Sequence, residues 1–139
     1  MLTFEWPVRV YYEDTDSGGV VYYANYLKFM ERARTEWLRD LGFEQDQLRD
    51  GHGVLFAVHR CAIEYHRPAR FNDELIATAA VKEYRRTALT FEQSVRRGDE
   101  ILTRGEIRVV CLDADTFRPK PIPEPMLTMI QGLITNDGR

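Results

Sequence analysis

Three acidic side chains, Glu13, Asp14 and Asp16, lie close together near the start of the sequence, directly before the glycines Gly18 and Gly19. Crowded like charges repel one another, and paired glycines cost conformational entropy on folding. A stretch that breaks two local preferences at once is a candidate functional site. The question is which chemistry acids and glycines could perform at this spacing.

Two known acidic motifs fit the stretch poorly. As a calcium-binding loop, it has Asp14, Asp16 and Gly19 at suitable positions, but Gly18 and Asn25 stand where ligating side chains belong. As a phosphotransfer motif of the D-x-D-x-T kind, it has Gly18 in place of Thr or Val. A third interpretation stays open, in which the acids form a solvated turn that caps the next helix, because the helix dipole favours acids there.

The stretch also suits acyl transfer to water. Glycines let the backbone approach a ligand, and a helix N-terminus offers N–H groups that can stabilise an oxyanion on an acyl carbonyl. A carboxylate held beside those groups can attack the carbonyl or activate a water molecule. A serine or cysteine triad is not indicated, because G-x-S-x-G is missing from the sequence and neither cysteine has an evident histidine partner.

The run VRVYYEDTDSGGVVYYANYLKFMERARTEWL resembles the signature of hotdog-fold acyl-CoA thioesterases of the 4-hydroxybenzoyl-CoA thioesterase type. It is similar in particular to the acyl-CoA thioesterases of bacterial Tol–Pal gene clusters, and the later run EYHRPARFND matches them as well. The resemblance implies hydrolysis of a fatty or aromatic acyl-CoA without a cofactor. It also implies a homodimer or homotetramer with the acyl tunnel at the subunit interface.

The resemblance assigns roles within the stretch. It implies that Asp16 is the catalytic carboxylate and that backbone N–H groups near Tyr22 and Tyr23 bind the oxyanion, with Gly18–Val20 as the substrate loop. Glu31 is the alternative base, because other hotdog branches use a carboxylate from the helix. Otherwise Glu31 is a supporting acid paired with a neighbouring arginine.

CoA phosphates need cationic partners, and Arg85 and Arg86 are candidate contacts for them. Two competing functions remain. A dehydratase or isomerase on a related scaffold would normally use histidine, and the run DTDSGG contains none. A non-enzymatic adaptor that binds acyl carrier protein or an envelope complex stays open.

Apolar periodicity predicts the elements that position the stretch. A strand is expected over Val8–Tyr12 and a helix over Tyr23–Leu41, which Gly42 ends in the left-handed conformation with Phe43 packing beyond it. After Gly53 the period changes to two, which predicts strands. They are expected over residues 54–66, 73–84, 88–97 and 100–113, with short helices over 44–49 and 126–133.

This order of elements predicts an α+β hotdog fold, with a five-stranded antiparallel sheet wrapped around one long central helix. A sheet of long strands leaves open edges, so at least a dimer is expected. The length of 139 residues indicates a single domain, over residues 1–134, with a frayed tail at 135–139.

The composition narrows the class of protein further. A net charge of −3 argues against nucleic acid as the partner. A cytoplasmic protein without a transmembrane segment is expected, because no apolar run reaches about 20 residues and no signal peptide is evident. Cys61 and Cys111 are expected as buried, reduced thiols. The three histidines lack the spacing of a metal site, so no metal is expected.

Overall fold

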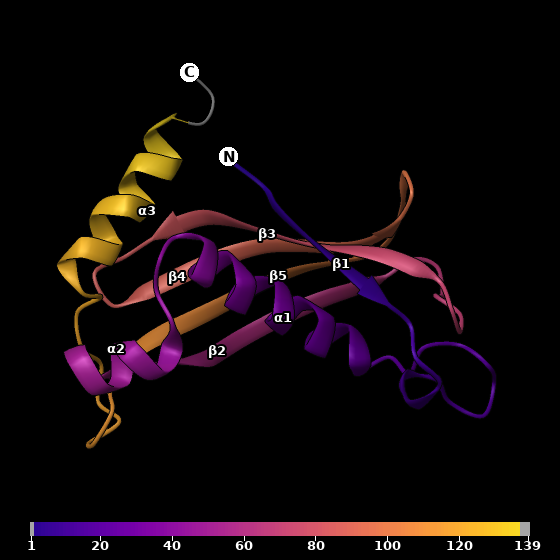
Figure 1. Ribbon diagram of the computed structural model, residues 1–139, viewed down its shortest axis with the longest axis horizontal. Helices are drawn as coiled ribbons and strands as arrows, with labels where there is room; N and C mark the ends of the chain where they lie inside the picture. The colour runs from indigo at the N-terminus through magenta and orange to yellow at the C-terminus, as the bar shows by residue number, and fades with distance from the viewer. Residues whose placement is uncertain (1, 137–139) are drawn as a thin grey trace.

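A five-stranded antiparallel sheet dominates the computed structural model, which describes residues 2–136 (Figure 1). The strands lie side by side in the order β1–β3–β4–β5–β2, so β1 and β2 are the two edges. The fold is therefore α+β. The elements in chain order are β1 (Phe4–Arg9), the 3₁₀ turn η1 (Tyr12–Asp14), α1 (Asn25–Asp40), α2 (Gln45–His52), β2 (Val54–Tyr65), β3 (Glu74–Tyr84), β4 (Ala88–Arg97), β5 (Glu100–Asp113) and α3 (Glu124–Asn136).

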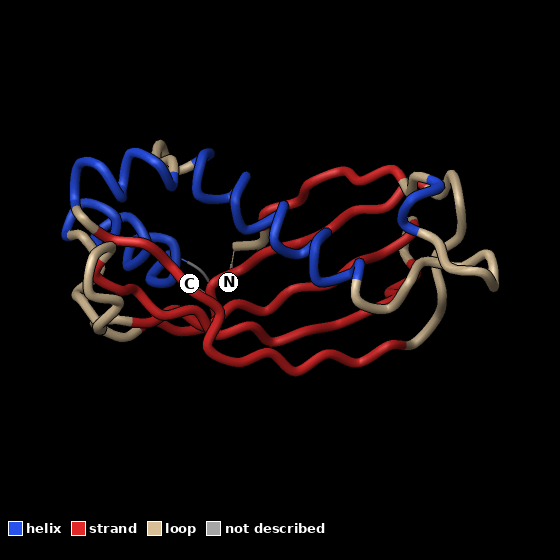
Figure 2. Tube along the Cα trace, turned by 90° about the horizontal axis from the view of Figure 1, so that it is seen from below, coloured by secondary structure: helices blue, strands red, loops and turns tan. Residues whose placement is uncertain are grey.

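Helix α1 lies across one face of the sheet (Figure 2). Its apolar residues recur at steps of three and four, so Phe29, Met30 and Ala33 are fully buried against the strands. Further along the helix, the Trp37 ring meets the Phe91 ring of β4 edge to face, with 5.1 Å between the ring centroids. Because this stripe anchors most of the helix, it also fixes the N-terminus of α1 relative to the sheet.

The end of α1 confirms the expectation for Gly42. Its φ of +96° is left-handed, its N–H donates to the Arg39 carbonyl (2.9 Å), and the Phe43 N–H donates to the Leu38 carbonyl (3.1 Å). These two bonds satisfy the last carbonyls of the helix. The helix begins two residues later than expected, at Asn25.

The expected five-stranded antiparallel sheet is confirmed, and two further helices stand where short ones were expected, although both extend beyond the expected bounds. Residues 2–136 contain three α-helices, of which α1 is the longest. Helix α3 includes the first two residues of the expected frayed tail, and residues 137–139 lie outside the described residues. Within residues 2–136, no helix has the length and apolar character needed to cross a bilayer.

The first strand differs from the expectation. It spans Phe4–Arg9 rather than Val8–Tyr12. Pro7 is tolerated inside it, because β1 is an edge strand that pairs only with β3. The strand ends early because the Asp14 carboxylate accepts the Tyr11 N–H (Oδ2–N 2.8 Å), which draws the chain into η1.

Only one of the two cysteines is buried, so the expectation was wrong for Cys61. Burial raises the pKa of the Cys111 thiol to about 11. Cys61, in contrast, is exposed on the edge strand β2. Alternation of apolar residues predicts which face of a strand a residue occupies. It does not reveal that α1 packs chiefly on β1, β3 and β4 and leaves β2 less covered.

Candidate active site

Asp14 ties the acidic stretch to the start of α1. It is buried, with its Oδ1 accepting from the Asn25 side-chain amide (2.9 Å) and its Oδ2 accepting the Tyr11 N–H. Its backbone carbonyl accepts the Tyr22 N–H at 2.9 Å. Both carboxylate oxygens therefore serve the structure, and Asp14 is not free to react with a substrate.

Asp16 is exposed and organises a tight turn. Its Oδ1 accepts the Gly18 N–H at 2.8 Å. Its backbone carbonyl accepts the Gly19 N–H (3.0 Å), and its own N–H donates to the Val20 carbonyl (2.9 Å). Gly19 has a φ of +80°, which explains a glycine at this position. The turn orients one oxygen of the Asp16 carboxylate, and the other has no protein donor within residues 2–136.

The start of α1 carries no side-chain cap. The residue before it, Ala24, cannot supply one, and Asp14 binds the side chain of Asn25 rather than a backbone N–H of the helix. The interpretation of the acids as a helix cap is therefore not supported. The first-turn N–H groups of a helix lack intrahelical partners, so an uncapped start leaves donors for a ligand.

The peptide N–H of Tyr23 is the donor that best fits this role. The Tyr22 carbonyl accepts the Asn25 N–H at 2.8 Å. Because the C=O and N–H of a trans peptide point in opposite directions, the Tyr23 N–H points away from that bond. Within residues 2–136, neither Tyr23 nor Ala24 donates its N–H to a protein acceptor, whereas the Tyr22 N–H is already committed to Asp14. Of the two expected oxyanion donors, Tyr23 remains available and Tyr22 does not.

A second segment, the connection between β2 and β3, makes backbone hydrogen bonds to the acidic turn. The Val21 N–H donates to the Ala69 carbonyl (2.9 Å), and Val20 forms an isolated β-bridge with Arg70. The Ala69 N–H in turn donates to the hydroxyl oxygen of Tyr26 (2.9 Å), and Tyr26 is buried on α1 as its spacing predicted. The acidic turn, α1 and the β2–β3 connection therefore form one unit.

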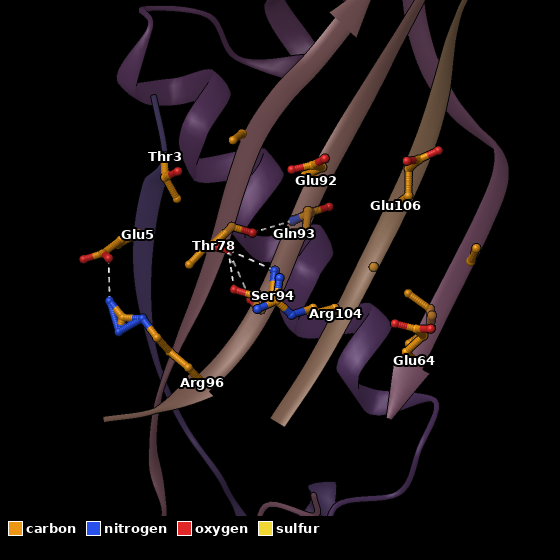
Figure 3. Close-up of a pocket in the computed structure, with 14 residues that line it drawn as sticks. Thr3, Glu5, Glu64, Thr78, Glu92, Gln93, Ser94, Arg96, Arg104 and Glu106 are labelled. Carbon is orange, nitrogen blue, oxygen red and sulfur yellow. Dashed lines mark hydrogen bonds and ion pairs between the residues drawn. The ribbon is translucent and has the colours of Figure 1, made fainter. Parts of the chain in front are cut away.

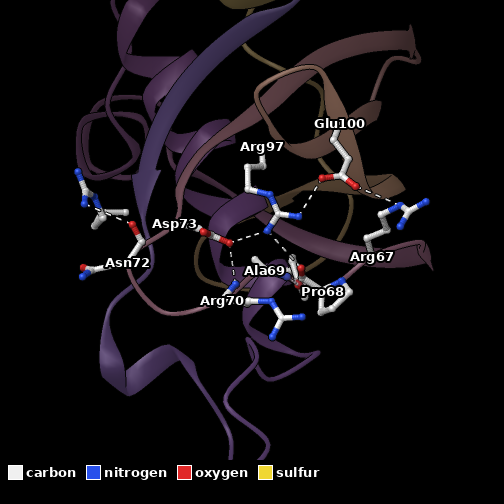
Figure 4. A network of polar contacts seen from close by, with 10 residues as sticks. Arg67, Pro68, Ala69, Arg70, Asn72, Asp73, Arg97 and Glu100 are labelled. Atoms are coloured by element: carbon white, nitrogen blue, oxygen red, sulfur yellow. Dashed lines mark hydrogen bonds and ion pairs between the residues drawn. The ribbon is translucent and has the colours of Figure 1, made fainter.

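Ion pairs attach the β2–β3 connection to the neighbouring strands of the sheet (Figure 4). The Asp73 carboxylate accepts from the Arg70 N–H (2.8 Å) and from the Arg97 guanidinium (2.6 Å). Arg97 also contacts Glu100 at 2.8 Å, and Glu100 pairs with Arg67 at 3.1 Å. Because Arg97 lies on β4 and Glu100 lies on β5, these contacts fix the connection to two strands of the sheet.

Exposed aromatic rings surround the turn. The Tyr65 hydroxyl donates to the Tyr23 carbonyl (3.0 Å), and the rings of Tyr22 and Tyr23 lie 4.9 Å apart. Clustered exposed apolar surface marks a contact site for a ligand or a partner. The large rings exposed at this end of the molecule are Tyr11, Tyr12, Tyr22, Tyr23, Tyr65 and Phe71.

Glu31 lies apart from the acidic turn. It is exposed on α1, eight residues beyond Tyr23, which is about 12 Å along a helix. The expected pairing with a neighbouring arginine is absent from the described residues, since neither Arg32 nor Arg34 approaches it within 4 Å. Arg32 instead sits over the Phe29 ring, 5.6 Å from its centroid.

Arg85 and Arg86 lie at the opposite end of the sheet from Asp16. They form the turn between β3 and β4, where the Arg86 carbonyl accepts the Ile122 N–H at 2.9 Å. The acidic turn sits at the other end of β3, beside the β2–β3 connection (Figure 1). Strand β3 has 11 residues, a length on the order of 35 Å. One chain alone does not bring these arginines to Asp16.

A hollow of about 690 Å³ lies away from the predicted site. Figure 3 shows it on the sheet face turned away from α1, where Glu5 pairs with Arg96 and the hydroxyls of Thr78 and Ser94 lie 2.8 Å apart. None of the predicted site residues lines it. Within residues 2–136, no group of three or more His, Cys, Asp or Glu side chains could hold a metal ion.

Three residues that build the site were not predicted as site residues from the sequence: Asn25, Tyr65 and Ala69. Tyr65 is 42 residues from its partner Tyr23, and Ala69 is 43 residues from Tyr26. Periodicity carries no signal for contacts at such separation. Two of these residues lie in the run EYHRPARFND, which matches the family. That match indicated that the run matters but assigned no role to either residue.

The fold is shared with solved structures of thioesterases. A solved structure described as a probable thioesterase from Bartonella henselae matches with a TM-score of 0.85 at 31% identity, covering 88% of this chain and 100% of that one. A 1,4-dihydroxy-2-naphthoyl-CoA thioesterase structure from Staphylococcus aureus shares the fold, with a TM-score of 0.90 at 22% identity over 100% of this chain and 97% of that one.

The chain belongs to the thioesterase-like superfamily, whose sequence profile matches residues 10–130. Two relatives are the acyl-CoA thioester hydrolase YbgC of Escherichia coli O157:H7 and the acyl-CoA thioesterase YbgC of Haemophilus influenzae, each 43% identical to this chain. The first match covers 89% of this chain and 92% of the relative, and the second covers 87% and 89%. The family resemblance of the acidic stretch is thereby confirmed.

Proposed function

We propose that this protein is an acyl-CoA thioesterase, which hydrolyses a fatty or aromatic acyl-CoA to the free acid and CoA. The observation that carries the proposal is the single folded unit that holds the exposed Asp16 carboxylate and the uncommitted N–H groups of Tyr23 and Ala24. The names of the two bacterial relatives support the same activity.

The proposed mechanism begins with the thioester carbonyl oxygen accepting the Tyr23 N–H, helped by the Ala24 N–H. These donors stabilise the negative charge that develops on this oxygen. Asp16 then acts in one of two ways. As a general base it takes a proton from water while the hydroxide adds to the carbonyl carbon, and the resulting oxyanion then collapses, breaking the C–S bond and releasing CoA thiolate, which regains the proton from Asp16. As a nucleophile it displaces CoA thiolate to form an anhydride, which water then hydrolyses.

The activity is tested by measuring thiol release from acyl-CoAs of graded chain length and from an aromatic acyl-CoA. We expect saturable release with at least one of them. Binding of acyl carrier protein without thiol release from any acyl-CoA would favour the adaptor function instead.

We also propose that the active enzyme contains at least two copies, paired through β2. Of the two sheet edges, β1 has six residues and contains Pro7, whereas β2 has 12 residues and exposes Val58 and Tyr65. A long open edge favours pairing with another strand. In the assembled enzyme, α1 would be the central helix of the hotdog fold. Separately, the two free cysteines suit a cytoplasmic location, where thiols stay reduced. Equilibrium sedimentation at micromolar concentration should give a dimer or tetramer, and a well-folded monomer would contradict this assembly.

A two-fold axis at β2 would reverse the strand direction of the second copy. The β3–β4 turn of one subunit would then lie at the same end of the assembly as the acidic turn of the other. This is how Arg85 and Arg86 could contact the phosphates of CoA. Their exposed side chains suit such a contact.

Reversing both charges, Arg85→Glu with Arg86→Glu, should raise KM for acyl-CoA roughly tenfold, because charge-assisted contacts to phosphate are lost. Turnover should change little, since phosphates are bound equally in the ground and transition states. The matched control is Arg49→Glu with Arg118→Glu, which makes the same change in net charge at two other exposed arginines. A fall in kcat at constant KM would show that Arg85 and Arg86 do not bind phosphate.

A further inference from the structure

A hollow of about 320 Å³ runs along α1 on the side facing the edge strand β2. Its wall is apolar and comes from Leu27 of α1, Val58 and Cys61 of β2, and Ile107 of β5. Leu27 is four residues beyond Tyr23, about one helical turn. The hollow therefore begins about one helical turn from the N–H groups that would bind the thioester, within reach of an acyl chain attached there.

A guanidinium lies at the far end of this apolar path. Arg34 is half-buried, and it lines both this hollow and a smaller one of about 40 Å³ beneath α1, which Trp37 and Phe91 help to enclose. Burial lowers the pKa of Arg34, which reflects the cost of removing its charge from water. Such a charge is normally compensated by a carboxylate.

Within residues 2–136, no carboxylate lies within 4 Å of Arg34. Its Nη1 donates to the Gln93 side-chain oxygen at 2.9 Å. Gln93 is buried, and its amide nitrogen donates to the carbonyls of Met30 and Thr78, each at 2.9 Å. The two backbone carbonyls lock the orientation of Gln93, and Gln93 holds Arg34 in place. A guanidinium has five N–H donors, so most of those of Arg34 are left for a ligand.

The other charges at the hollow compensate Arg34 only in part, because the Glu31 carboxylate favours the charged guanidinium through space but lies more than 4 Å from it. Lys28 and Glu31 also line it, and both are exposed. Their charges are opposite, so the three side chains together leave the hollow with one net positive charge. A planar guanidinium matches the two oxygens of a carboxylate, and a bond between two charged groups is stronger than a neutral one.

We propose that Arg34 binds a carboxylate at the far end of the acyl chain, so that the enzyme prefers acyl-CoAs that end in a carboxylate over plain fatty acyl-CoAs of equal length. This inference rests on the proposed thioesterase function. Arg34 is 11 residues beyond Tyr23, about 16 Å along the helix. Only an extended acyl chain spans that distance, whereas a single aromatic ring stops short of Arg34.

The test compares kcat/KM for pairs of acyl-CoAs of equal chain length, one ending in a methyl group and the other in a carboxylate. For chains long enough to reach Arg34, the wild type should favour the carboxylate by roughly tenfold or more, the scale of a charge-assisted bond. Arg34→Met keeps the apolar stem and should abolish the preference while retaining hydrolysis of the methyl-ended substrate. Arg34→Lys keeps the positive charge but loses the planar guanidinium, and it should preserve part of the preference for the carboxylate.

The matched control is Arg32→Met, which removes a neighbouring arginine that packs on Phe29 and should leave the preference unchanged. A wild type that hydrolyses both substrates without preference overturns the role of Arg34 and leaves the thioesterase function intact. A preference that survives in Arg34→Met also overturns the role of Arg34 and leaves the thioesterase function intact. It would mean that another group binds the carboxylate or that a second copy fills the hollow. Hydrolysis of neither substrate by the wild type would count against the thioesterase function itself.

Discussion

Replacing Asp16 by Asn should lower kcat for acyl-CoA hydrolysis by roughly 100-fold or more, the scale of a lost acid–base group. The substitution keeps the shape of the side chain and the acceptor for the Gly18 N–H, so the turn should survive. It removes the basic oxygen that either proposed role of Asp16 requires. Steady-state kinetics on one acyl-CoA, with folding checked by a thermal melt, measures the effect.

Two other acids serve as controls for this substitution. Glu13 is exposed in the same stretch, and Glu13→Gln should leave kcat within a few-fold of wild type. Glu31→Gln tests the alternative base on α1 and should also be mild. If Asp16→Asn keeps near-wild-type turnover while Glu31→Gln is inactive, the reacting carboxylate is on the helix, and the role proposed for the acidic turn is wrong.

Replacing Asp14 by Ala should lower the free energy of unfolding by about 2–4 kcal/mol, because it leaves buried donors without acceptors. The two donors are the Asn25 amide and the Tyr11 N–H. For a chain of this length, the melting temperature should fall by on the order of 10 °C. Chemical denaturation and a thermal melt measure both quantities.

The matched control is Glu13→Ala, which alters an exposed acid one residue away and should change stability by about 0.5 kcal/mol or less. Measuring the activity of Asp14→Ala as well shows whether Asp14 has a structural role or a catalytic one. If Asp14→Ala melts like the wild type but loses activity 100-fold, then Asp14 rather than Asp16 is the reacting group.

The elements of the fold were largely predictable because they depend on local patterns. The apolar stripe from Tyr26 to Trp37 and the left-handed Gly42 define α1 and its end. Alternation predicted the strands after Gly53 to within a residue at each end. The first strand was misjudged because Pro7 reads as a strand start, and the pattern does not show that β1 is an edge where proline is tolerated.

The candidate site was predictable in part. Acids beside glycines at the start of a helix drew attention to the stretch, and the family resemblance selected Asp16, but local patterns gave no role to Asp14. Asp14 and Asp16 are both near the helix, and only the structure shows that one is buried in hydrogen bonds and the other is exposed. The commitment of the Tyr22 N–H was likewise invisible, because it depends on where the Asp14 carbonyl lies after folding.

The link between the acidic turn and the β2–β3 connection has a consequence for how the protein matures. Val20 and Val21 meet Arg70 and Ala69 about 50 residues along the chain, and the connection is itself fastened to β4 and β5 through Arg97. Contacts between such distant residues form late, since the intervening loop must close first. On a ribosome, α1 emerges well before the strands that complete its surroundings. A nascent chain can therefore contain every residue of the acidic turn and still lack hydrolytic activity until most of the sheet has been synthesised. An incompletely synthesised chain would then not hydrolyse the cell's thioesters.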